Sequence, residues 1–437
     1  MSKEKKVVAV IGAGLVGSLE ACYLAKRGYE VHVYEYREDI RKMEHVPGRS
    51  INLAMSVRGL GALNKIELDN HVQEEYGIPM YARMIHNTDG KTNPIPYGKE
   101  NQCIYSVGRR YVNEILLDQG STYDDIHFHF QHKLLKANLE KPELTFERQD
   151  VGESEIKLVT VKPDLVIGCD GAFSAVRKEM MKKPRFNYSQ TYIPHAYMEL
   201  CMPPVNGDFA MPPNFLHIWP RGQFMMIGLP NQDKSFTVTL FMPTETFENI
   251  KDKEGLLHFF NENFRDSISL IGKEKLISDF FSNKALPLVS VKCFPYHVGG
   301  KALIMGDAAH AMVPFYGQGM NCGMEDCLVL EAALDTHQDN LEKSLEEFSK
   351  NRNPDAEAMC DLAMYNYIEV IPLFLHNIPV HNLNDYFQMR DLVNKKSFLV
   401  RKKLDNFLHW LFPSFWVPLY TSVTFSRMRY NQCVSNR

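Results

Sequence analysis

The stretch "GAGLVG", residues 12–17, constrains the fold of this 437-residue chain more than any other feature. It follows an apolar, β-branched run that ends at Ile11, and it precedes a run with helical spacing, Leu15–Lys26. The next apolar run, "EVHVYE", ends at Glu35, roughly 20 residues after the glycines, which is the spacing of a dinucleotide-binding βαβ unit. The chain should therefore begin with a Rossmann-type strand, turn and helix.

Each glycine of this turn has a separate physical task. Gly12 permits a tight turn, Gly14 lets a pyrophosphate approach the backbone at the positive helix end, and Gly17 lets helix and strand pack closely. The Glu35 carboxylate would accept hydrogen bonds from ribose hydroxyls. We predict a dinucleotide site here; the alternative is a glycine-rich turn with a structural role alone.

Length and charge narrow the class of protein. The chain exceeds the ~250–300 residues that one core can serve, so two or three packed units are expected. A net charge of −4 provides no field for nucleic acid, so a polyanionic partner is not expected. Nine cysteines without a CxxC pair are typical of reduced thiols in an intracellular protein. No apolar run reaches the ~18–20 residues that span a bilayer, so we expect a soluble chain.

The order of the predicted elements indicates an α/β fold. Two further parallel-type strands occur at 164–171 and 301–310, antiparallel strands lie between them, and the sequence after Gly319 is mostly helical. We predict a Rossmann-type nucleotide-binding domain with an inserted, mostly antiparallel sheet and a C-terminal helical region. The expected boundaries are 1–185 (with part of the inserted sheet near 75–105), 186–290, 291–355 and 356–437.

Two later motifs suggest which dinucleotide is bound. "CDGAFSAVR" and "GDAAHAMVPFYGQGMN" each place an aspartate, Asp170 or Asp307, beside a glycine at the end of an apolar strand. Such a carboxylate can bind hydroxyls of a cofactor that lies across the sheet, and Asp307 suits the ribityl chain of a flavin. "GQGMN" would open a helix toward the isoalloxazine ring, where backbone N–H groups stabilise negative charge. These motifs favour FAD.

The order GxGxxG, DGxxSxxR, then GD followed by proline and GQGMN resembles the flavoprotein aromatic hydroxylases, which are single-component FAD monooxygenases. Within them, the chain resembles the kynurenine 3-monooxygenase family over nearly its whole length, through strings such as "GRSINLAMS", "ARMIH", "IPYG", "MYNYIE" and "VPLYTSVTFSRMRY". The resemblance implies an NADPH- and O2-dependent hydroxylation of L-kynurenine to 3-hydroxykynurenine through a flavin hydroperoxide, in tryptophan catabolism toward NAD synthesis.

The resemblance also implies where ligands bind. Because the flavin carries the chemistry, no catalytic side chain is expected. A fixed guanidinium, Arg83, would bind the substrate carboxylate bidentately. The implied substrate-binding residues are Arg83, Tyr97, Asn366, Glu369 and Tyr420. The implied cofactor-binding residues are Gly12, Gly14, Val16, Gly17, Tyr34, Glu35, Tyr36, Arg37, Ala54, Arg109, Leu134, Asp170, Asp307, Met320 and Asn321.

Two segments call for separate interpretation. In "HFHFQH", residues 127–132, apolar residues alternate with histidines, so we expect a strand with imidazoles outward and no metal site. The segment 370–388 is not expected from the family pattern and is interpreted as a loop or broken helix. Family members also continue into a helix in the outer mitochondrial membrane, facing the cytosol, whereas this chain stops at Arg437.

Two rival functions remain at this stage. Another FAD-dependent hydroxylase or epoxidase with a different substrate would keep Asp170 and Asp307 but would not need Arg83. A flavin-fold scaffold without flavin, like a Rab GDP-dissociation inhibitor, would have no chemical reason to keep Asp307 and GQGMN.

Overall fold

A parallel sheet forms the base of the molecule. The computed structural model describes residues 5–44, 52–97, 101–148, 157–370 and 419–435, without the side chains of 368–370. The predicted βαβ unit is present as β1 (Val7–Ile11), α1 (Leu15–Lys26) and β2 (Glu30–Tyr34). The strand order is β18-β19-β12-β1-β2-β8, parallel except for the edge pair β18–β19. The remaining strands are β8 (Ile126–His129), β12 (Leu165–Gly168), β18 (His297–Val298) and β19 (Ala302–Ile304).

The register of this sheet brings three turns together. Ile11 lies opposite Gly168, and Gly168 lies opposite Ile304. Because parallel strands end at the same edge, the glycine turn, the Asp170 turn and the Gly306 turn emerge side by side. Open α/β sheets bind ligands at this carboxyl edge.

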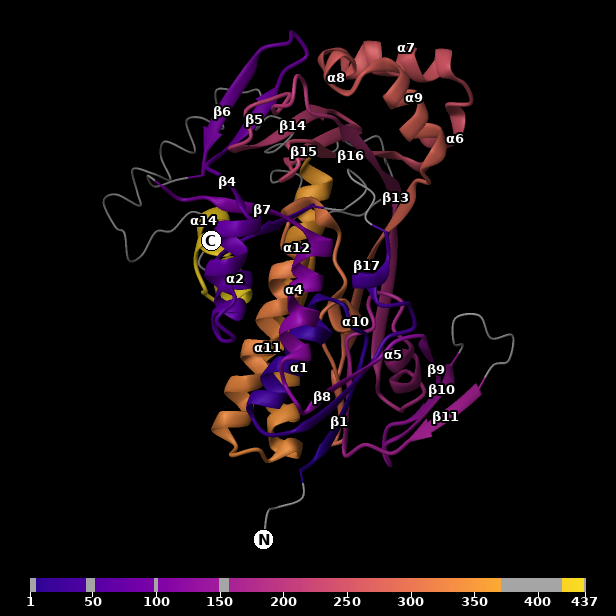
Figure 1. The fold of residues 1–437 in the computed structure, drawn as a ribbon, viewed down its shortest axis with the longest axis vertical. Coiled ribbons are helices and arrows are strands. Elements are labelled where there is room, and N and C mark those ends of the chain that lie inside the picture. Colours follow the sequence, from indigo (N-terminus) through magenta and orange to yellow (C-terminus); the bar gives the residue numbers. More distant parts are fainter. Residues whose placement is uncertain (1–4, 45–51, 98–100, 149–156, 371–418, 436–437) are drawn as a thin grey trace.

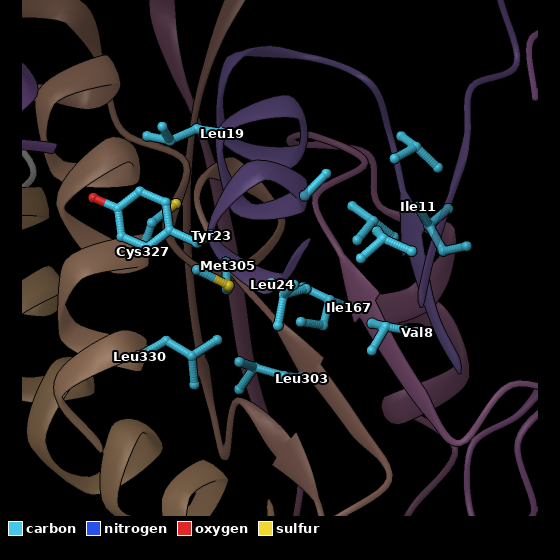
Figure 2. Close-up of a cluster of buried hydrophobic side chains, with 14 of the residues drawn as sticks. Val8, Ile11, Leu19, Tyr23, Leu24, Ile167, Leu303, Met305, Cys327 and Leu330 are labelled. Atoms are coloured by element: carbon cyan, nitrogen blue, oxygen red, sulfur yellow. The ribbon is translucent and has the colours of Figure 1, made fainter. Parts of the chain in front are cut away.

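Helices cover the sheet and complete its core. Figure 2 shows apolar side chains of the strands facing α1 and α11 (Gly319–Thr336). Each fully buried aliphatic or aromatic side chain contributes roughly 1.5–3 kcal/mol to folding. The helix α12 (Leu341–Val370) packs on α11, and α4 (Arg109–Ser121) packs on α1. The labelled residues of this cluster are Val8, Ile11, Leu19, Tyr23, Leu24, Ile167, Leu303, Met305, Cys327 and Leu330.

A second sheet of seven strands lies at the other end of the molecule (Figure 1). Its order is β17-β13-β16-β15-β14-β5-β6, antiparallel except for the parallel pair β14–β5. The long β13 and its partner β17 reach down toward the parallel sheet. The strands are β5 (Ala82–His86), β6 (Thr92–Pro96), β13 (Asn187–Met202), β14 (Phe215–Arg221), β15 (Phe224–Pro230), β16 (Phe236–Pro243) and β17 (Leu286–Phe294).

The two faces of β13 serve different cores. Met198 and Leu200 alternate into a cluster with the outer helices, whereas Tyr197 points to the opposite face, toward α12 and the C-terminal helices. The outer helices are α6 (Thr244–Asn249), α7 (Lys253–Asn263), α8 (Arg265–Ile271) and α9 (Lys273–Ser282). The predicted fold class, a Rossmann-type domain with an inserted, mostly antiparallel sheet and a helical C-terminal region, is confirmed.

Two small sheets complete the described strands. From the region near 75–105, only β5 and β6 join the seven-stranded sheet, because β7 pairs with β3 and β4 pairs with β7 instead. The domain boundaries stay a prediction. The first small sheet contains β3 (Asn52–Met55), β4 (Ile78–Met80) and β7 (Ile104–Gly108), and the second contains β9 (His132–Asn138), β10 (Glu143–Arg148) and β11 (Lys157–Val161).

The second small sheet changes the expected role of "HFHFQH". His127 is exposed as predicted, but His129 is half-buried and His132 is buried. The expectation that all the imidazoles point outward is wrong because β9 and β10 cover this end of β8. Tyr34 there stacks on His129 and on Phe146, with ring centroids 4.7 and 4.3 Å away.

The C-terminal part is helical where it is described. After α12 the described chain resumes with α14 (Leu419–Phe425) and α15 (Tyr430–Ser435), which contact α2 and α12, respectively. The segment 371–388, interpreted above as a loop or broken helix, lies outside the described residues. Within the described residues, no helix combines the length and apolarity that crossing a membrane requires. The shorter helices are η1 (Ile40–Lys42), α2 (Val57–Asn64), α3 (Asp69–His71), η2 (Val72–Tyr76), α5 (Ala175–Met180), α10 (Asp307–His310) and η3 (Pro314–Tyr316).

Candidate functional site

The glycine turn between β1 and α1 leaves space above a helix N-terminus. Gly12 has a φ of 103°, and a Cβ there would lie 2.5 Å from the Cys169 carbonyl oxygen. A Cβ on Gly17 would lie 1.9 Å from the Gly12 carbonyl oxygen. A Cβ on Gly14 would meet nothing within 4 Å. The first and third glycines are therefore required by the protein itself, whereas the absence of a side chain at Gly14 keeps open the place where a pyrophosphate would lie.

The residues after β2 differ in what they offer to a ligand. The Glu35 carboxylate accepts hydrogen bonds from the backbone N–H groups of Ala13 and Arg37, both at 3.0 Å. Tyr34 is buried, so only its backbone borders the turn, where its carbonyl oxygen accepts from Gly12 N at 2.8 Å. Tyr36 is 58% exposed, and its hydroxyl accepts from Arg37 Nε at 2.7 Å. Glu35, Tyr36 and Arg37 thus form the open side of the predicted nucleotide site.

The two strand-end aspartates have unequal surroundings. Asp170 Oδ2 accepts from the backbone N–H groups of Ala175 and Val176, at 2.6 and 3.1 Å, and so fixes the start of α5. Its Oδ1 is buried without a hydrogen-bond partner among the described residues. Burial raises the pKa of this carboxyl group, while Ser174 and the α5 backbone oppose the rise. Asp307 is exposed at the first position of α10. Both carboxylates keep an oxygen available for ligand hydroxyls.

Asn321 fixes the predicted cofactor site from within. Its Oδ1 accepts from Ser56 N at 2.8 Å, and its Nδ2 donates to the carbonyl oxygens of Ala54 and Gly317 at 2.9 and 3.1 Å. The amide group of this buried side chain thus makes its hydrogen bonds within the protein, where it joins β3 to the GQGMN turn. Its backbone near the start of α11 is the part that can face a flavin.

The remaining predicted cofactor residues come from four different elements. Val16 on α1 packs under the Gly306 turn, where a Cβ on Gly306 would come within 3.0 Å of it. Leu134 on β9 and Met320 on α11 are partly buried against the main core. Arg109 is exposed at the first position of α4. Its charge partly offsets the effect of burial, which raises the pKa of Glu199 on β13 to about 7.

The predicted substrate residues form an aromatic cluster around one guanidinium. The Arg83 guanidinium lies 4.0 Å from the Tyr420 ring centroid and 5.6 Å from that of Tyr97. The Tyr420 ring stacks with two other tyrosine rings. Its centroid lies 5.8 Å from that of Tyr97 and 5.7 Å from that of Tyr316. Ala54 packs against this cluster, so it borders the cofactor edge. Strand β5, the residue that follows β6, η3 and the C-terminal α14 thus meet at one place.

The hydroxyl of Tyr97 is buried in this cluster, near Arg83 and Tyr420. Tyr97 is 6% exposed, and its Oη has no hydrogen-bond partner among the described residues. Burial and the nearby Tyr420 raise the pKa of Tyr97 well above its usual value, although Arg83 opposes the rise. The phenol therefore stays neutral and can donate a hydrogen bond to a bound ligand.

Asn366 and Glu369 both lie on α12. Asn366 Nδ2 donates to the Phe315 carbonyl oxygen at 3.4 Å, which places it beside the η3 turn. The structure describes the backbone of Glu369 but not its side chain.

Arg58 was missed by the sequence reasoning although it holds the C-terminal helices in place. Its Nε donates to the Val423 carbonyl oxygen at 2.9 Å, and its Nη1 pairs with Glu325 at 2.6 Å. The Tyr430 ring lies 3.9 Å from its guanidinium carbon. Because Val423 is on the same short helix as Tyr420, Arg58 fixes the position of that ring. An arginine in an otherwise small and apolar helix was the available signal.

Asp326 was also missed, and it organises the Gly306 turn. Its Oδ2 accepts from Gly306 N and from His310 Nε2, both at 2.7 Å, and its Oδ1 accepts from Arg352 Nε at 2.6 Å. Although burial opposes ionisation, His310 and Arg352 hold the pKa of this carboxyl below its usual value. An acid within the apolar run "GMEDCLVL" was the signal that could have revealed it.

A Rossmann-type sheet whose open glycine turn and two strand-end aspartates share one edge defines an FAD-binding flavoprotein. A family model described as "FAD binding domain" matches residues 5–363. Among solved structures, 2-methyl-3-hydroxypyridine-5-carboxylic acid oxygenase shares the fold with a TM-score of 0.65 and 19% identity, covering 83% of this chain and 91% of that chain. The class is that of the FAD-dependent monooxygenases.

Sequence relatives specify the family. A kynurenine 3-monooxygenase from Anopheles gambiae is 55% identical, covering 98% of this chain and 84% of the relative. One from Drosophila willistoni is 51% identical, covering 100% of this chain and 91% of the relative. The chain belongs to the kynurenine 3-monooxygenase family.

Proposed function

We propose that this protein hydroxylates L-kynurenine to 3-hydroxykynurenine with NADPH and O2 as co-substrates. The observation that carries the proposal is the Arg83 guanidinium, which lies over Tyr420 beside a buried and unpartnered Tyr97 hydroxyl. A planar cation between aromatic rings suits a ligand that combines a carboxylate with an aromatic ring. L-Kynurenine has both groups.

Each substrate residue has a distinct task in this proposal. Arg83 binds the α-carboxylate bidentately, and the Tyr97 hydroxyl donates a further hydrogen bond to it. Tyr420 holds the guanidinium in place by stacking, and Asn366 approaches the substrate from α12. Glu369, on the same helix, is the proposed partner of the α-amino group.

The cofactor residues support FAD in an extended position across the sheet edge. Gly14 leaves room for the pyrophosphate, Glu35 accepts from the adenosine ribose, and Asp307 accepts from the ribityl chain. FAD, when bound and reduced by NADPH, would activate O2 and so supply one of its oxygen atoms. Because the aniline nitrogen already activates the ring carbon ortho to it, the chain needs no base and acts by orienting the ring and excluding water.

The experiment compares two substrates that differ in one group. L-Kynurenine should stimulate NADPH oxidation by the FAD-containing protein. Kynuramine, which lacks the carboxylate, should give the same stimulation only at a concentration at least about 100-fold higher. In Arg83→Ala the difference between the two compounds should shrink to the part that the Tyr97 hydroxyl supplies, roughly 5- to 30-fold, while FAD content stays unchanged. Equal stimulation by both compounds in the wild-type protein would contradict the proposed binding of the substrate carboxylate by Arg83.

The family resemblance also supports a location at the mitochondrial outer membrane, facing the cytosol. Fractionation of the source cells, with protease treatment of intact mitochondria, tests this. Activity in the mitochondrial fraction that is lost on protease treatment is the expected result, and activity confined to the mitochondrial matrix would contradict it.

A further inference from the structure

We propose that Glu30, His32 and His127 bind a divalent transition-metal ion, with Zn²⁺ as the best match, at the edge of the parallel sheet. One ligand atom from each of these side chains lies within 4.8 Å of the other two. His32 and His127 lie directly opposite each other on the paired strands β2 and β8. Glu30 precedes His32 by two residues on β2, so the pleat places all three side chains on one face.

The ligand set and its spacing suit zinc. Two imidazoles and a carboxylate, completed by a water molecule, are a common tetrahedral set for Zn²⁺. Bonds of roughly 2.0–2.2 Å place tetrahedral ligand atoms about 3.3–3.6 Å apart. Glu30 Oε1 and His32 Nε2 are already 3.1 Å apart. The third ligand can approach by a rotamer change, because His127 is exposed.

A second imidazole orients the central ligand. His32 Nδ1 lies 2.9 Å from His129 Nε2, and the His129 ring stacks on Tyr34 with centroids 4.7 Å apart. When the proton of this hydrogen bond resides on His32 Nδ1, the lone pair of His32 Nε2 faces the Glu30 carboxylate. A cation between these two atoms removes their repulsion. Partners that hold the non-ligating nitrogen in this way are usual around metal-bound histidines.

This inference reverses the sequence-based expectation for "HFHFQH". The alternation of that stretch supplies a single metal ligand, His127, and the other two come from β2. A bound ion would join β2, the strand that presents Glu35 to the predicted nucleotide site, to the edge strand β8.

Equilibrium dialysis against Zn²⁺, followed by elemental analysis, tests the site on the FAD-containing protein. The wild-type chain should bind one zinc ion more than His127→Ala or Glu30→Gln. The matched control is His258→Ala, because His258 lies 3.3 Å from Glu262 in an exposed pair on α7 without the Glu30–His32–His127 arrangement. The control should retain the wild-type zinc content. Cysteine-bound zinc is common to all four proteins and cancels in the comparison.

Thermal unfolding gives a second readout. Zn²⁺ should raise the melting temperature of the wild-type and His258→Ala proteins but not of His127→Ala. Equal zinc content and equal zinc-dependent shifts in the wild-type and His127→Ala proteins would overturn the proposal, and a proton shared by Glu30 and His32 would then account for their contact.

Discussion

Tyr97 carries a buried hydroxyl that the described protein does not satisfy, so its removal separates binding from stability. In Tyr97→Phe we expect unchanged or slightly higher stability, by up to about 1 kcal/mol, because an unpaired buried polar group is lost. The KM for L-kynurenine should nevertheless rise roughly 5- to 30-fold through the loss of one hydrogen bond to a charged group. Denaturant unfolding and steady-state kinetics measure the two effects. A stability loss of several kcal/mol with unchanged KM would show that the hydroxyl serves the fold.

Glu199 should make stability depend on pH in a defined direction. Burial raises its pKa from the ordinary value of 4.5 to about 7, so the folded state holds a proton that the unfolded state releases. Its contribution to stability is complete below pH 4.5 and is lost as the pH rises through 7. Relative to the wild type, Glu199→Gln should therefore gain on the order of 1 kcal/mol between pH 5 and pH 8, since partial exposure reduces the full effect.

Urea unfolding of the wild-type and Glu199→Gln proteins at pH 5 and pH 8 measures this difference. A constant difference between the two proteins across that range would show that the carboxyl group is ionised in the folded state at pH 5.

At the scale of elements, the β1–α1 turn contains two kinds of glycine: those that folding requires and one that ligand binding requires. Gly14 has φ −76° and ψ −172°, which alanine also adopts, and its Cβ would lie in open space. Gly14→Ala should therefore fold with a stability within about 1 kcal/mol of the wild type. It should bind FAD at least about 10-fold more weakly, since the methyl group occupies the place of the pyrophosphate.

The comparison variant is Gly17→Ala, whose Cβ would collide with the Gly12 carbonyl oxygen. This variant should lose stability even without flavin. Thermal unfolding of flavin-free protein and fluorescence titration with FAD distinguish the two. Normal FAD affinity in Gly14→Ala would place the pyrophosphate elsewhere.

The Gly306 turn depends on α11 through Asp326. Asp326→Asn should cost roughly 3–5 kcal/mol, because Arg352 and His310 lose a buried anionic partner. FAD retention should fall as well, since the same carboxylate positions the turn that presents Asp307. Asp335→Asn on the same helix is the control: its side chain is 61% exposed, and its pair with Arg27 should contribute less than about 1 kcal/mol. Wild-type flavin content in Asp326→Asn would show that Asp326 does not position the Gly306 turn for FAD.

At the scale of the whole molecule, the sequence patterns predicted those features of the fold that residues close together in the chain determine. The βαβ unit and the strands ending near Asp170 and Asp307 followed from periodicity and glycine positions. The stacking of Arg83 on Tyr420 did not, because it depends on a helix from the far end of the chain, and only the family resemblance placed the two residues together. The burial of His132 was missed for a similar reason, since this residue begins β9 of the second small sheet, where its ring contacts Phe146 on β10.

The chemistry proposed for the whole molecule is tested most directly by the product formed from L-kynurenine, NADPH and ¹⁸O2. Mass spectrometry and comparison with authentic standards should identify 3-hydroxykynurenine that carries one ¹⁸O atom, formed in proportion to the NADPH consumed. NADPH oxidation without a hydroxylated product, or hydroxylation at another ring position, would contradict the proposed function.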